Sequence, residues 1–150
     1  MCRGMLSVLL ISLCGPLLAE DKANYFDDPF LQVTNGIAGC PVPPGPEITQ
    51  KEMRLQAHVR VERGNSCYLS GRCRLSNAYQ YDKEIIPRVK KVIDASGHFA
   101  GSSVWVLGQR RWVWLKGCVR IKADAKALEQ LVHQIDDVEA VIDELVVTGR

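Results

Sequence analysis

The sequence has almost no excess of one charge, and it lacks the motifs that mark common enzyme and metal sites. Its 150 residues carry 19 basic and 17 acidic side chains, which gives a formal net charge of +2. So small an excess gives no reason, from charge alone, to expect binding to nucleic acid. The sequence also has no glycine-rich phosphate loop, no C-x-x-C pair and no histidines at metal-ligand spacing. We therefore expect no catalytic site, no cofactor and no metal.

Only one long apolar run is present, and it lies at the N-terminus. Residues 1–19, MCRGMLSVLLISLCGPLLA, combine Arg3, an apolar stretch and a small residue, Ala19. This is the build of a secretory signal peptide, and the stretch is too short to span a bilayer. We predict cleavage after Ala19 and a mature protein that is soluble or peripheral rather than transmembrane. Lipidation at Cys14 is the alternative, which Leu13 disfavours because a lipobox has a small residue there.

Beyond residue 19 the sequence predicts an arm followed by alternating strands and helices. Residues 20–46 show no sustained period and end in a proline-rich link, so we expect an irregular arm. Residues 53–61 and 67–75 alternate apolar and polar side chains, which predicts a hairpin. We expect a helix to begin at Ala78. Residues 89–96 are compatible with either a helix or a strand. A second hairpin (104–107 and 112–121), a helix (123–135) and a strand (141–147) complete the chain.

Four cysteines remain after the predicted signal: Cys40, Cys67, Cys73 and Cys118. An even number in an oxidising compartment predicts two disulfides rather than a zinc site or free thiols. Cys67 and Cys73 lie on one predicted strand, which would place them about 20 Å apart. A disulfide needs Cα atoms within about 7 Å. We therefore expect each of them to bond to Cys40 or to Cys118, in either order, and not to the other.

The two hairpin-containing regions look like copies of one unit. The segment CYLSGRC in the first corresponds to VWLKGCV in the second, and VKKVID corresponds to VEAVID. Internal repetition of this kind indicates duplicated structural units. We place the units at residues 47–96 and 97–150.

The second unit resembles a BON domain. Its strand has the family's apolar-x-Leu-x-Gly-x-apolar pattern and its closing segment the Val-x-x-Val-x-x-x-Leu-x-Val pattern, formed by Val113, Leu115, Gly117 and Val119 and by Val138, Val141, Leu145 and Val147. Residues 53–96 resemble a more divergent copy. The resemblance implies an α+β fold of two BON-like units, each a small mixed sheet with helices packed on one face. Disulfides are expected to link them.

The resemblance also carries expectations about function. Tandem BON domains are typical of exported proteins of Gram-negative bacteria, have been proposed to bind phospholipid, and are not enzymatic. The protein is thus expected in the periplasm, peripheral to the outer membrane, with anionic phospholipid or an envelope protein as partner. The alternative is a structural or accessory subunit of a secretion or envelope assembly that acts through protein–protein contacts. Its oligomeric state is left open.

Two surfaces are candidates for such contacts. The sheet face of the second unit that points away from its helices is rich in tryptophan, with basic residues at its rim: Trp105, Trp112, Trp114, Arg110, Arg111 and Lys116. Either it binds lipid or a partner, or it is covered by the other unit or by residues 26–40. The first hairpin would present Arg54, Arg60, Arg72 and Arg74 on one face. These either bind an anionic headgroup or form a solvated surface.

Overall fold

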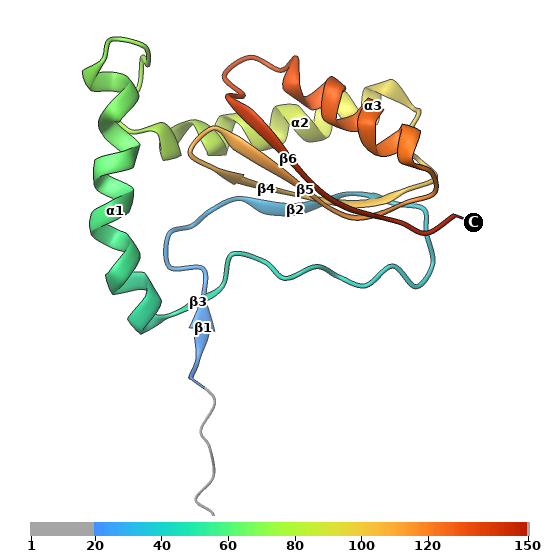
Figure 1. Ribbon diagram of the computed structural model, residues 1–150, viewed down its shortest axis with the longest axis horizontal. Helices are drawn as coiled ribbons and strands as arrows, with labels where there is room; N and C mark the ends of the chain where they lie inside the picture. Colours follow the sequence, from blue (N-terminus) through green and yellow to red (C-terminus); the bar gives the residue numbers. More distant parts are fainter. Residues whose placement is uncertain (1–19, 150) are drawn as a thin grey trace, which may run out of the picture.

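The structure is a computed structural model that describes residues 20–149 (Figure 1). The predicted signal peptide, with the alternative lipidation site Cys14, lies outside the described residues. Two disulfides join the four cysteines between residues 40 and 118. The number of disulfides is thus as predicted, and such bonds are typical of oxidising, extracytoplasmic environments.

A four-stranded mixed sheet forms the centre of the fold. Its strand order is β2 (Phe30–Asn35), β4 (Ser103–Gln109), β5 (Trp112–Val119) and β6 (Ala140–Val147). The first three are antiparallel neighbours, and β6 runs parallel to β5. The predicted hairpin and closing strand of the second unit are therefore present. The predicted irregular arm differs from expectation, because it contains two strands, of which β2 forms an edge of this sheet.

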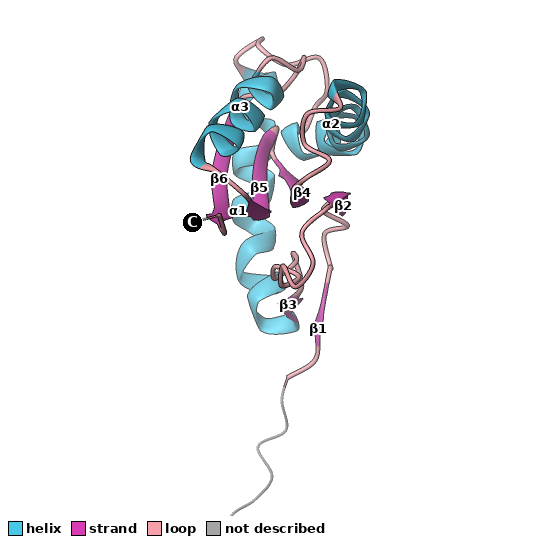
Figure 2. Cartoon of the chain, turned by 90° about the vertical axis from the view of Figure 1, so that its right-hand side faces the viewer, coloured by secondary structure: helices cyan, strands magenta, loops and turns pink. Residues whose placement is uncertain are grey.

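Two helices, α2 (Asp82–Ser96) and α3 (Lys122–His133), cover one face of this sheet (Figure 2). A short 3₁₀ helix, η1 (Ala78–Tyr81), leads into α2. Residues 89–96 are helical, and α2 continues through Pro87. The apolar side chains of both helices recur at helical spacing, so each helix turns one apolar face toward the sheet. The largest side chains of this core are fully buried: Ile85, Ile86, Val89, Ile93, Leu128 and Val132 from the helices, and Val104, Val106, Val113, Leu115 and Val119 from the strands.

Residues 53–61 and 67–75, for which we predicted a hairpin, lie in the helix α1 (Gln50–Leu69) and in the loop that follows it. That prediction was wrong. Thr49 and Glu52 form a capping box at the start of α1, which fixes the helix N-terminus. The side chains that face the rest of the protein recur every three or four residues, as a helix requires: Met53, Ala57, Arg60, Gly64 and Cys67. Before α1, the two-residue strands β1 (Lys22–Ala23) and β3 (Ile48–Thr49) pair with each other.

The pairing of the cysteines also differs from the prediction. Cys67 bonds to Cys73, with Cα atoms 5.3 Å apart, and Cys40 bonds to Cys118. Cys67 lies in the last turn of α1, and the chain turns back after the helix through Gly71, whose φ is 72°. The 20 Å separation assumed an extended strand that does not exist. With a helix in this place, residues 47–96 contribute only the two-residue strand β3 to a sheet, and a second BON-like unit is not shown.

Candidate functional site

The face of the sheet opposite α2 and α3, which we call the outer face, carries the predicted tryptophan surface. Part of it is covered by residues 40–46, the proline segment. This segment runs along the outer face (Figure 1) and is fixed by the disulfide between Cys40 and Cys118. Lys116 Nζ lies 3.5 Å from the carbonyl oxygen of Pro44. The proline segment of the arm, rather than a second unit, therefore covers this part of the outer face.

The tryptophans of the outer face differ in exposure. Trp105 is buried, with 7% of its surface exposed. Trp112 and Trp114 are half-buried, and their ring centroids lie 6.1 Å apart with the ring planes at 35°. The guanidinium of Arg110 lies 4.9 Å from the centroid of the Trp112 ring, within the range of a cation–π contact. The structure thus brings together Arg110, Trp112 and Trp114, which we call the aromatic patch, and Trp105 is left out of it because it is buried.

Lys116 is on the outer face but is not a free cation. Its ammonium lies 3.1 Å from Glu144 Oε2 on β6, and its side chain is 14% exposed. Beside this pair, a groove of the outer face lies between the proline segment and the two last strands. It is lined by Pro41, Val42, Pro43, Pro44, Lys116, Gly117, Cys118, Glu144, Val146 and Thr148. The groove is mainly apolar and holds one internally neutralised ion pair.

The turn that carries Arg110 is held by a buried carboxylate. Arg110 and Arg111 both have positive φ, 59° and 67°, which is unfavourable for residues with side chains. Asp82, at the start of α2, accepts hydrogen bonds from both backbone N–H groups, at 2.7 and 2.8 Å. Asp82 is 1% exposed. Burial raises the pKa of Asp82 to about 7, although the two hydrogen bonds act in the opposite direction. Asp82 at the start of α2 thus positions the turn that places Arg110 beside Trp112.

Arg60 of α1 makes its polar contacts within the fold. Its guanidinium makes two hydrogen bonds with Asp28, at 3.0 and 2.5 Å, and lies between the rings of Phe26 and Tyr79. Gln109 of β4 also donates to Asp28, at 2.6 Å. Asp28 is buried, so this ion pair is largely removed from water. The Arg60–Asp28 pair fastens α1 to the sheet.

The other predicted arginines do not share one face, because the strand expected to hold them is a helix followed by a loop. Arg54 and Arg72 are exposed, and Arg72 Nε donates to the hydroxyl of Ser70. Arg74 pairs with Glu84, and this pair raises the pKa of its guanidinium. The prediction of a four-arginine surface is therefore wrong in its geometry.

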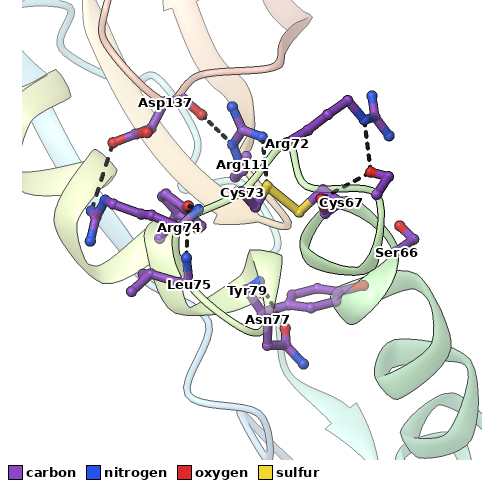
Figure 3. Close-up of a disulfide and its surroundings, with 12 residues drawn as sticks. Ser66, Cys67, Arg72, Cys73, Arg74, Leu75, Asn77, Tyr79, Arg111 and Asp137 are labelled. Atoms are coloured by element: carbon purple, nitrogen blue, oxygen red, sulfur yellow. Dashed lines mark hydrogen bonds and ion pairs between the residues drawn. A yellow bond between two sulfur atoms is a disulfide. The ribbon is translucent and has the colours of Figure 1, made fainter.

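Arg111 joins three parts of the chain at the end of α1. Its Nη1 lies 3.2 Å from the sulfur of Cys73, and its Nε donates to the main-chain oxygen of Asp137 at 2.8 Å (Figure 3). The carboxylate of Asp137 in turn lies 2.9 Å from Arg88 of α2. Arg111 thus points away from the rim of the outer face, where we expected it, and its contacts are structural.

The family comparison identifies one of the two predicted units. A family model for the BON domain matches residues 81–149. These residues form a BON domain. The match begins at the end of η1 and takes in α2, β4, β5, α3 and β6, so the aromatic patch and Asp82 belong to the BON domain and α1 precedes it. The family model does not extend to a second unit. Comparison with curated proteins and with solved structures finds no match.

The BON domain is linked to membrane and phospholipid association and is generally non-catalytic. Across residues 20–149, no three His, Cys, Asp or Glu side chains are grouped so that they could hold a metal ion. Within the same range, no helix has the length and apolar character needed to cross a bilayer.

Proposed function

We propose that the protein is a non-catalytic envelope protein, exported to the periplasm and peripheral to the outer membrane, that binds an anionic phospholipid surface through its BON domain. The aromatic patch carries this proposal, because it is a half-exposed pair of tryptophans with a cation beside them. The association of BON domains with membranes and phospholipid supports it. The two disulfides support a compartment outside the cytoplasm.

The chemistry of the aromatic patch suits the surface of a bilayer. Indole rings combine an apolar body with a polar N–H and are enriched at the membrane–water interface. Arg110 has no carboxylate within ion-pairing distance among those residues, so its guanidinium is available to a phosphate group. We expect the rings to lie among the headgroups and Arg110 to contact a phosphate.

Flotation with phospholipid vesicles tests this proposal. Vesicles that contain anionic phospholipid are mixed with the wild-type protein and with the double variant Trp112→Ala, Trp114→Ala. Each buried aromatic contact contributes on the order of 1 to 2 kcal/mol, so the double variant should bind at least about tenfold more weakly. Tyr68→Ala with Leu69→Ala is the matched control, because both side chains are exposed on α1. Equal losses in the two double variants would contradict the proposal.

Arg110→Gln and Arg72→Gln form a second matched pair, since each removes one positive charge. We expect Arg110→Gln to weaken flotation with anionic vesicles more than Arg72→Gln does, and neither to change flotation with zwitterionic vesicles. If both substitutions weaken flotation with anionic vesicles by the same amount, Arg110 contributes only through the net charge of the protein. The aromatic patch then does not bind the headgroup.

The second candidate is a structural or accessory subunit that acts through protein–protein contacts. It is favoured by one observation: β6 is the last strand of the sheet and no described residue pairs with its outer edge. Size-exclusion chromatography with light scattering separates the two candidates. A monomer that binds vesicles supports phospholipid binding, whereas an oligomer that does not bind vesicles supports the subunit.

A further inference from the structure

The free edge of β6 has a defined pattern of charge and apolar surface. The strand reads AVIDELVV, with two carboxylates at its centre and apolar residues on both sides. Asp143 and Glu144 are exposed; Glu144 pairs with Lys116, and Asp143 Oδ1 accepts a hydrogen bond from the backbone N–H of Leu145. Val146 and Val147 are also exposed, at 61% and 45%. Residues 136–149 contain five acidic side chains and no basic one. An exposed strand edge with apolar flanks is a place where an extended segment can add to a sheet.

Both faces beside this edge offer contacts to the side chains of an added strand. On the outer face, Val146 and Glu144 line the groove beside the proline segment. On the opposite face, Leu145 packs against the core beneath α3. Because side chains of a strand alternate between faces, a segment paired with β6 would place successive residues against each of these surfaces in turn.

A second copy of this chain is a poor occupant of the edge. Pairing β6 with itself about a two-fold axis is centred on one residue, and the two registers of greatest overlap are centred on Asp143 or Glu144. Each of these registers places a carboxylate directly opposite its own symmetry mate. Like charges directly opposite each other destabilise a strand pair. The edge therefore disfavours itself and is complementary to a segment of opposite charge.

We infer that the free edge of β6 binds an extended segment of another protein, in which two neighbouring basic residues lie between β-branched apolar residues. Main-chain hydrogen bonds to β6 supply the affinity, and a basic residue opposite Asp143 sets the register, because Glu144 already pairs with Lys116. The inference rests on the second candidate function and names the partner chemistry. It involves a different edge of the BON domain from the aromatic patch, so the two proposals can fail separately.

Three blocked octapeptides test the inference on the wild-type protein, by fluorescence anisotropy and by amide hydrogen exchange of β6. The sequence TVVKRVVT is the expected ligand, and TVVEEVVT reverses its charge. TVPKRPVT keeps the charge, but its prolines stand at one odd and one even position, so one ladder N–H is lost in either register. We expect TVVKRVVT to bind and to slow exchange in β6, and each of the other two to bind at least about tenfold more weakly.

A charge reversal on the edge has a matched control on α1. Asp143→Lys should weaken TVVKRVVT by roughly three- to tenfold and strengthen TVVEEVVT, because the charge at position 143 is then reversed. Glu62→Lys makes the same change of net charge at an exposed position of α1 and should leave both affinities unchanged.

Four results would overturn the inference. The first is equal binding of TVVKRVVT and TVPKRPVT, which would mean that charge alone acts. The second is unchanged exchange in β6 when TVVKRVVT is bound. The third is dimerisation of the free protein through β6, seen by light scattering and abolished by Asp143→Lys. Vesicle flotation by the wild-type protein in the absence of peptide binding would overturn this inference and leave the membrane proposal intact.

Discussion

The two longer helices of the protein are held in different ways. Helix α2 has 15 residues and buries Asp82, Ile85, Ile86, Val89 and Ile93. Helix α1 has 20 residues and buries only Gly64 and Cys67, while Leu55 is 68% exposed and Leu69 is 76% exposed. Helix α2 is therefore stabilised by the apolar core. Helix α1 depends on specific bonds, namely the Arg60–Asp28 pair and the disulfide between Cys67 and Cys73.

This difference separates the stability of the BON domain from that of the segment before it. Apolar burial in the core is lost only when the domain unfolds, whereas a few specific bonds can open locally. We predict that substitutions in α1 reduce stability mainly near α1. Substitutions beneath α2 or in the sheet should reduce the stability of the whole domain. The variants below compare the two regions, beginning with the largest expected effect.

The largest effect is expected from the disulfide that holds the proline segment to β5. Cys40 and Cys118 are separated by 78 residues, so their bond closes a long loop of the unfolded chain. Chain-entropy estimates give about 4.5 kcal/mol for a loop of this length. Cys40→Ala with Cys118→Ala should lower the free energy of unfolding by about that amount, as measured by urea denaturation. A loss below about 1 kcal/mol would mean that the unfolded chain is already compact in this region.

A matched truncation in each helix gives the next largest difference. Ile86 is fully buried, so Ile86→Ala should cost about 3 to 4 kcal/mol by removing apolar contacts and leaving a cavity. Leu55→Ala on α1 should change the free energy of unfolding by less than about 0.5 kcal/mol, because the side chain is mostly exposed. Similar losses in the two variants would show that Leu55 is buried against something in solution.

Removal of the shorter disulfide should have a smaller and more local effect. Cys67 and Cys73 are six residues apart, for which the chain-entropy estimate is about 2 kcal/mol. In Cys67→Ala with Cys73→Ala, amide exchange should accelerate in the last turns of α1 and in the loop that follows. Exchange in β4 and β5 should change little by comparison. Equal acceleration in α1 and in the sheet would contradict the separation of the two regions.

A further effect is expected from pH, through Asp82. The pKa of this acid is raised from 3.8 to about 7, so the folded protein holds a proton that the unfolded chain releases at lower pH. Its contribution to stability is therefore full below about pH 4 and is lost as the pH rises to about 7. Asp82→Asn removes the titrating group. The free energy of unfolding of the wild type minus that of this variant should decrease across this pH range, and a difference that increases would show that the pKa is lowered instead.

The sequence predicted the BON domain well because its periodicity and its burial agree. In β4, β5 and α3 the apolar residues recur with the period of the element, and those that recur are the residues that the structure buries, such as Val113, Leu115 and Leu128. Residues 53–61 also alternate, but there the alternation is misleading. Leu55 and Val61 are apolar and exposed, so the rule that apolar residues point inward fails. The capping box of Thr49 and Glu52 was the local signal for a helix.

The candidate site was predictable only in part. Trp112 and Trp114 were found because alternate residues of one strand share a face. The bonds of Asp28 and Asp82 were not predictable, since Asp28 meets Arg60 across 32 residues and Asp82 meets the turn across 28. The prediction that Cys67 would not bond to Cys73 failed for a related reason, because this bond depends on the path of the chain after α1. Contacts between residues that are far apart in the sequence can be identified only when the fold is known.

Intrinsic tryptophan fluorescence in vesicles with brominated acyl chains tests the membrane account most directly. The chain has three tryptophans, and all of them lie on β4 and β5 of the BON domain, whereas α1 has none. If the aromatic patch enters the interface of an anionic bilayer, the bromine atoms should quench the fluorescence of the bound protein. Protein that floats with the vesicles while its tryptophan fluorescence stays unquenched would contradict the account, because contact would then be made elsewhere.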